Sequence, residues 1–275
     1  MQSPVHMYLE SQMQLRLFFK LLTLPLLTTL VAGAACSSTG ANSGKSATAN
    51  TAADDSVGFS QDSSADPAPA IERYAKILEK NPADANAREA LKRLIDGPNP
   101  VSNEQSQRIR EILRQYARAA KVSLVNNDEP GERLTVSGRV RNTAGQPIAE
   151  ALIYVFQTDT NGHYTRTRVM NEPNARLFGF LKTDNAGHYE FNTIRPGGYP
   201  GAPGREGEQW RIPQHIHFQV TALGYQFRKF QMVFADDPRM TPYWHEWARK
   251  GNNTVVTVNR DNDSAQHVVC DITLQ

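Results

Sequence analysis

The chain has 275 residues, of which 30 are Lys or Arg and 28 are Asp or Glu, so its formal net charge is +2. This balance lacks the clustered positive excess that binding to phosphates requires, which excludes nucleic acid as the expected partner. Two cysteines are too few for a disulfide scaffold or a thiolate zinc site, and 39% hydrophobic residues with 8% aromatics exclude disorder throughout.

Residues 1–36 have the layout of an export signal. Arg16 and Lys20 precede an apolar run, and small residues at positions 33–35 end it. This arrangement is typical of a signal peptide rather than of a membrane-spanning helix. Cys36 follows directly, which predicts lipid attachment and an exported lipoprotein anchored on the periplasmic or cell-surface side of a membrane. The alternative is a soluble exported protein that is cleaved nearby.

A low-complexity stretch and a helical segment follow the export signal. Residues 37–68 are rich in small and polar side chains and are expected to form a disordered tether. Residues 69–121 show three amphipathic helical patterns, the third of which opens with a capping box of Ser102 and Gln105. These helices either dock on the following domain or pair two subunits, which leaves a homo-oligomer open.

From about residue 132 the hydrophobic period changes from that of a helix to that of a strand. Alternating or β-rich runs fall at 134–141, 151–156, 178–182, 188–191, 215–220, 227–234, 254–258 and 267–273, with turn residues between them. Short strands at this spacing are typical of a sandwich or barrel. The predicted fold is therefore mainly β: an antiparallel β-sandwich over residues 132–275, preceded by the short α-helical segment.

Two histidines in one predicted strand are the first candidates for chemistry. His215 and His217 are two residues apart, so their imidazoles point to the same face of the strand. Such a pair is half of a metal site, or it is simply a polar pair. The segment 212–234 contains no acidic residue that would complete a site of two histidines and one carboxylate.

Two tyrosines in predicted turns precede the histidine pair. Tyr164 follows the turn residues Asn161 and Gly162, and Tyr199 lies in the run Arg195-Pro-Gly-Gly-Tyr-Pro. A phenol has a pKa of about 10, so an ionised tyrosine needs a strong cation beside it. Two imidazoles and two phenolates would suit a hard trivalent ion such as Fe(III).

Residues 132–275 resemble the intradiol ring-cleavage dioxygenases of the catechol and protocatechuate type. The matching pieces are Gly138-Arg-Val, Gly145-Gln-Pro-Ile-Ala-Glu-Ala, Val155-Phe-Gln-Thr-Asp-Thr-Asn-Gly-His-Tyr164, Thr183-Asp-Asn-Ala-Gly-His-Tyr-Glu-Phe-Asn-Thr-Ile-Arg-Pro-Gly-Gly-Tyr199-Pro and Pro213-Gln-His215-Ile-His217-Phe. Their order and spacing together carry the resemblance. It implies a prealbumin-like β-sandwich that holds non-haem Fe(III) through Tyr164, Tyr199, His215 and His217.

The activity that the resemblance implies is intradiol cleavage of a catechol-type aromatic with O2, giving a cis,cis-muconate-type diacid. Tyr199 would also accept a proton, and Gln231 matches a glutamine that lines the site in the family. Family members commonly carry Arg-Pro-x-His before the first histidine, where the arginine stabilises negative charge on the ring. Here Ile212 stands at the position of that arginine, and Arg211 is the candidate to replace it.

Two other interpretations stay open at this point. The segment 134–194 also resembles prealbumin-like modules of exported proteins, which would make the chain a binding or structural lipoprotein. The missing arginine keeps an iron-binding but inactive relative in view. The complete set of two tyrosines and two histidines favours the enzyme. Outside this set, the aromatic run 242–247 is expected to be a packed loop and Cys270 a buried thiol.

Overall fold

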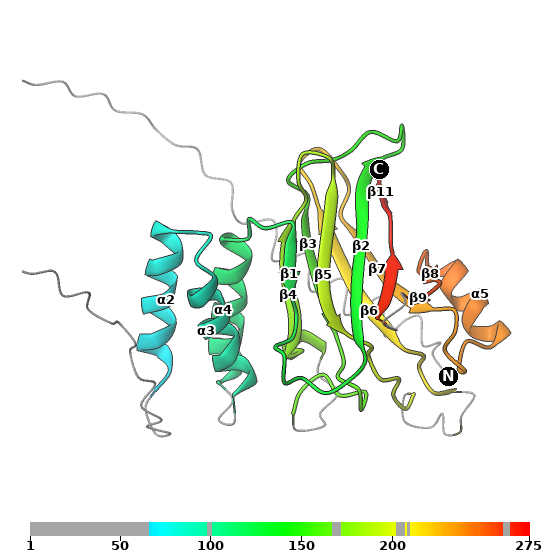
Figure 1. Ribbon diagram of the computed structural model, residues 1–275, viewed down its shortest axis with the longest axis horizontal. Coiled ribbons are helices and arrows are strands. Elements are labelled where there is room, and N and C mark those ends of the chain that lie inside the picture. Colours follow the sequence, from blue (N-terminus) through cyan, green and yellow to red (C-terminus); the bar gives the residue numbers. More distant parts are fainter. Residues whose placement is uncertain (1–65, 98–100, 167–171, 202–206, 208–209, 261–264) are drawn as a thin grey trace, which may run out of the picture. The chain divides into compact units, whose positions relative to one another are not determined.

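The computed structural model describes residues 66–97, 101–166, 172–201, 207, 210–260 and 265–275. All of them belong to the unit Ser60–Gln275 (Figure 1). The expected export signal with Cys36, and nearly all of the expected tether, lie outside the described residues. In the part of the chain that the structure describes, the helices are too short or too polar to cross a membrane.

Three helices begin the described part of the chain: α2 (Ala68–Lys80), α3 (Ala85–Asp96) and α4 (Asn103–Gln115). The predicted capping box opens α4, because Ser102 Oγ accepts from the backbone of Gln105 and the Gln105 side chain accepts from the backbone of Ser102. The helical part ends at Gln115, earlier than the expected residue 121. The cause is β1 (Lys121–Ser123), which pairs with a strand of the sandwich.

The remaining strands form the two sheets of a sandwich. They are β2 (Arg133–Asn142), β3 (Leu152–Gln157), β4 (Leu177–Lys182), β5 (His188–Ile194), β6 (His215–Thr221), β7 (Arg228–Phe234), β8 (Thr254–Val256), β9 (Asn259–Arg260), β10 (Gln266–Val269) and β11 (Ile272–Leu274). One sheet has the order β1-β5-β2-β10-β9, with β11 also on β2, and the other has the order β4-β3-β6-β7-β8. The predicted sandwich is confirmed, and every predicted run contains a strand.

The sequence had suggested antiparallel sheets, but both sheets also contain parallel pairs. The central pairs β2–β5, β3–β4, β3–β6 and β6–β7 are antiparallel, but β1–β5, β7–β8, β10–β2 and β11–β2 are parallel. A parallel pair needs a long connection, and α5 (Pro242–Lys250) supplies it between β7 and β8. The aromatic run 242–247 lies within α5, so the prediction of a packed loop there was wrong.

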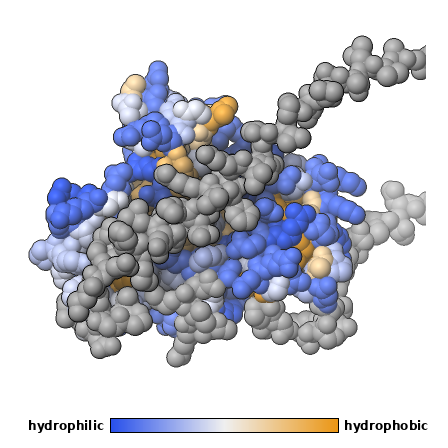
Figure 2. Space-filling model, turned by 180° about the vertical axis from the view of Figure 1, so that it is seen from behind, coloured by the Kyte–Doolittle hydropathy of each residue, from blue (hydrophilic) through white to orange (hydrophobic). Residues whose placement is uncertain are grey.

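Two apolar clusters lie on opposite faces of the five-stranded sheet. The core between the sheets takes alternate residues of each strand, and Cys270 is fully buried in it, as expected. The outer face carries Phe156 and Phe178, which cluster with side chains of α2, α3 and α4. Figure 1 shows these helices beside β1 and β4. On the side seen in Figure 2, hydrophilic residues predominate among those coloured, and the hydrophobic ones form small separate patches.

Candidate metal centre

The histidine pair lies on the outer face of the five-stranded sheet, at the start of β6. The alternation of the strand sends Ile216 and Phe218 into the core between the sheets and leaves His215 and His217 on the other face. Both imidazoles are buried, with exposed fractions of 3% and 1%. One strand therefore serves the core and the candidate site at once.

The four predicted ligands converge. Tyr164 Oη lies 2.8 Å from His217 Nε2, 3.3 Å from His215 Nε2 and 3.2 Å from Tyr199 Oη. Tyr199 Oη lies 3.3 Å from His215 Nε2, and the two Nε2 atoms are 3.1 Å apart. Donors that each lie about 2 Å from one metal ion are separated by about 3 Å, so this spacing fits a single ion.

The electrostatics of the site also fit a metal ion. His215 Nδ1 lies 2.7 Å from the carbonyl oxygen of Pro213, which makes Nδ1 the protonated nitrogen and leaves the Nε2 lone pair toward the other donors. Burial lowers the pKa of His215 to about 4 and that of His217 well below its usual value. Both imidazoles are therefore neutral and able to bind a metal at neutral pH.

The phenols require a cation to ionise. Burial raises the pKa of Tyr164 far above its ordinary value, and the neighbouring Tyr199 and Glu172 act in the same direction. A bound trivalent ion would oppose these effects and favour the phenolate. Among the described residues, no group of three or more His, Cys, Asp or Glu side chains is arranged to hold a metal ion. The donor set fits Fe(III).

The two turns that carry the tyrosines contact each other through their backbones. Gly197 N donates to the carbonyl oxygen of Asp159 at 2.7 Å. A Cβ atom on Gly197 would lie 2.4 Å from the carbonyl oxygen of Thr160 and 2.5 Å from the nitrogen of Gly162. Gly162 itself has a φ of +79°, which favours glycine. Glycines thus allow the close approach that brings Tyr164 and Tyr199 together.

The roles of the other two predicted site residues, Gln231 and Arg211, stay predictions. Gln231 is the cross-strand partner of His217, so it belongs to the same face of the sheet. Arg211 is partly buried beside Ile212, and its catalytic role stays a prediction. Ile212 exchanges two backbone hydrogen bonds with Tyr199 and joins the apolar cluster of both tyrosines. The position expected to hold a cation is therefore apolar.

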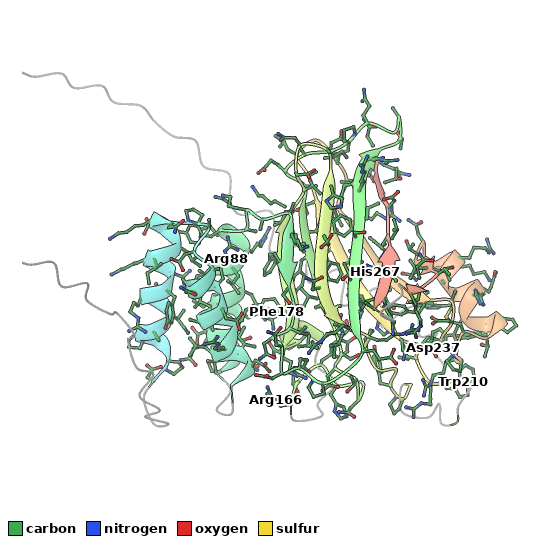
Figure 3. All side chains as sticks on the ribbon, in the orientation of Figure 1. Arg88, Arg166, Phe178, Trp210, Asp237 and His267 are labelled. Atoms are coloured by element: carbon green, nitrogen blue, oxygen red, sulfur yellow. The ribbon has the colours of Figure 1, made fainter. Side chains whose placement is uncertain are left out.

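Sequence reasoning missed Asp237, which supports the histidine strand. Its side chain is fully buried, and Oδ2 accepts from the backbone nitrogen of Gln214 at 2.6 Å, directly before His215. Figure 3 shows Asp237 at the end of the sandwich where α5 lies. Because aspartates are common in turns, the sequence carried no signal that distinguished it.

Comparisons with known proteins identify relatives of this chain. The family model described as "Dioxygenase" matches residues 113–275, more than half of the chain. The protocatechuate 3,4-dioxygenase beta chain of Burkholderia cepacia is 38% identical over 120 residues, covering 42% of this chain and 50% of that protein. A chlorocatechol 1,2-dioxygenase of Rhodococcus opacus is 36% identical over 122 residues, covering 40% of this chain and 47% of that protein.

Among solved structures, the dioxygenase domain of a dioxygenase carbohydrate-binding protein fusion from Streptomyces sp. SirexAA-E is 25% identical. It covers 58% of this chain and 88% of that one, with a TM-score of 0.42. The matched region spans about half the length of the two relatives named above. On the strength of the family match, the chain belongs to the intradiol ring-cleavage dioxygenase family.

Proposed function

We propose that this chain is a non-haem Fe(III) enzyme that cleaves a catechol-type aromatic ring by the intradiol route with O2, giving a cis,cis-muconate-type diacid. The observation that carries the proposal is the convergence of Tyr164, Tyr199, His215 and His217, in which each donor atom lies 2.8–3.3 Å from at least two of the others. The named relatives act on protocatechuate and chlorocatechol, which supports a dihydroxylated aromatic substrate.

The four residues of the site are proposed to bind the metal ion, and Tyr199 is also proposed to accept a proton. When bound, Fe(III) supplies the Lewis acidity that activates a chelating catechol. The neutral imidazoles of His215 and His217 hold the ion, and Tyr164 adds an anionic ligand. Tyr199 Oη is the candidate acceptor for a proton of the incoming catechol. The burial of all four side chains excludes bulk water from the chemistry.

A second candidate function is iron binding without turnover. The observation that favours it is Ile212, an apolar residue paired with Tyr199 at the position where the family resemblance leads us to expect an arginine. Loss of a cation near the ring would leave iron binding intact and reduce the stabilisation of charge that develops on the substrate.

One experiment separates these candidates. The purified full chain is assayed for iron, and its visible spectrum is recorded before and after anaerobic addition of catechol. Tyrosinate-to-Fe(III) charge transfer should colour the protein, and catechol should shift the band. Admission of O2 should then produce the absorbance of a muconate. A coloured protein whose band shifts but which does not react with O2 supports the second candidate. A colourless protein with full iron loading contradicts the tyrosinate-bound centre on which both candidates depend.

We also propose that the chain is exported and anchored by a lipid on Cys36. The support is the order of basic, apolar and small residues that precedes Cys36. The test is the mass of the mature N-terminal peptide from membranes, compared with that of Cys36→Ala. The expected result is a lipid-modified Cys36 and release of the variant into the soluble fraction; an unmodified N-terminus would contradict the anchor.

A further inference from the structure

The helices α2 and α3 lie outside the family match, which begins at residue 113, yet α3 contacts the segment that carries Tyr164. Asp96 is the last residue of α3. Its Oδ1 lies 3.0 Å from Arg166 Nη2, and its carbonyl oxygen accepts from Arg166 Nε at 2.8 Å. Arg166 follows Tyr164 by two residues, and Figure 3 shows it between the helices and the sandwich.

A second arginine, Arg176, contacts both the carboxylate of Asp96 and the backbone of Tyr164. Arg176 Nη1 lies 3.4 Å from Asp96 Oδ1, and the backbone nitrogen of Arg176 donates to the carbonyl oxygen of Tyr164 at 2.8 Å. Asp96 therefore binds one residue that follows Tyr164 along the chain and another that is hydrogen-bonded to Tyr164 itself.

The guanidinium of Arg176 also reaches the turn that precedes Tyr164. It lies 2.7 Å from Glu129 Oε2 and 3.3 Å from Asp159 Oδ2, and its exposed fraction is 7%. Asp159 Oδ1 in turn accepts from the backbone nitrogen of His163 at 3.0 Å. Arg176 is buried, and charge-assisted contacts of a buried side chain are strong and specific in geometry. Together with the pair of Arg166 and Asp96, these contacts constrain the backbone on both sides of Tyr164.

We propose that Asp96 is a positioning residue for Tyr164. Together with Arg166 and Arg176 it forms an ionic latch through which α3 holds this phenol in the metal centre. The inference rests on the proposed iron centre. It assigns the helical segment a part in the chemistry of the sandwich, because a phenol that is held in place gives up less freedom when it binds iron.

The test replaces Asp96 by its neutral isostere in the full chain. Asp96→Asn should release iron to a chelator about 10-fold faster, as loss of an outer-shell partner typically does, and should shift the tyrosinate-to-iron band. Glu89→Gln makes the same change on the same helix, at an exposed pair with Arg93, and should change neither readout. An Asp96→Asn protein with the release rate and band of the unmodified chain overturns the inference, even if its thermal midpoint falls.

A second variant guards against loss of the fold. Arg166→Gln changes a side chain that is 57% exposed and removes the same contact from the other partner. In a double-mutant cycle on the iron-release rate, the two changes should be less than additive, and strict additivity overturns the latch. An unmodified chain that takes up no iron overturns the proposed function and this inference together. If the unmodified chain is coloured and Asp96→Asn changes neither the iron-release rate nor the band, only the inference is overturned.

Discussion

The ring of Phe156 lies face to face with the imidazole of His217, with centroids 4.4 Å apart and planes 3° apart. The two residues are cross-strand partners on β3 and β6, so the register of the sheet sets this stack. Both rings are buried. Phe156 therefore fixes the plane of His217 and with it the direction of the Nε2 lone pair.

Replacing Phe156 should loosen the histidine without removing a ligand. Phe156→Leu keeps an apolar side chain but loses the flat surface against His217. We expect about 10-fold weaker iron binding, measured by chelator competition. Phe180→Leu is the matched control, because Phe180 stacks on Tyr154 at 4.6 Å. Equal losses in the two variants would show that the stack on His217 has no special role.

Removing a phenol that binds iron should reduce the visible absorbance, whereas removing a phenol outside the centre should not. Tyr164→Phe deletes the oxygen that lies 2.8 Å from His217 Nε2, so we expect loss of tight iron binding and of most visible absorbance. Tyr154→Phe removes another phenol, a partly buried one that accepts from Arg110 at 3.2 Å. The control should keep its iron and its band, and an intact spectrum in Tyr164→Phe would remove this residue from the centre.

The contact between the two tyrosine turns leaves no room for a side chain at Gly197. Gly197→Ala would force its new methyl group against the backbone of Thr160 and Gly162, and we expect about 2 kcal/mol of lost stability with a loss of iron affinity. Gly145→Ala places a methyl group in open space and is strained only by its φ of +80°, at about 1 kcal/mol. Chemical denaturation with and without iron measures both effects. Unchanged iron affinity in Gly197→Ala would contradict the role of this contact.

The stability of the sandwich should fall in acid through Asp236. The hydrogen bond from Arg195 holds the pKa of the Asp236 carboxyl below its usual range. Its contribution is therefore fully present above the unfolded pKa of about 3.9 and is lost as the pH falls below that value. Asp236→Asn should lower the thermal midpoint at neutral pH, and the difference from the unmodified chain should shrink as the pH falls through the lowered pKa of Asp236.

The control for this pH dependence is Asp128→Asn, the same change at an exposed aspartate. The thermal midpoint of Asp128→Asn should differ little from that of the unmodified chain at every pH. A deficit of Asp236→Asn that stays constant between neutral and acid pH would mean that the charge of the carboxylate contributes nothing.

The placement of the histidine pair could be predicted because it depends on one strand. Alternation puts His215 and His217 on one face whatever the rest of the chain does. Their meeting with Tyr164 and Tyr199 was implied by resemblance alone, since it depends on the contact at Gly197 between turns that are distant in sequence. Asp96 and Arg166 are 70 residues apart, and no local pattern marks them as a pair.

The helix α5 is an element whose conformation was predicted wrongly from local sequence. Its aromatic residues suggested a loop, but Pro at its start suits a first turn, and Trp244 and Ala248 are buried four residues apart on one face. A helix of nine residues is not stable alone, so packing against the sandwich decides its conformation.

The division of β6 and its neighbours between two faces puts the candidate metal centre on the opposite side of the sheet from the core between the two sheets. Positions 154, 156, 219, 229 and 231 share the face of the histidine pair, while the positions between them fill the interior. A library restricted to these outward positions could therefore be screened for new aromatic substrates while the hydrophobic interior stays constant.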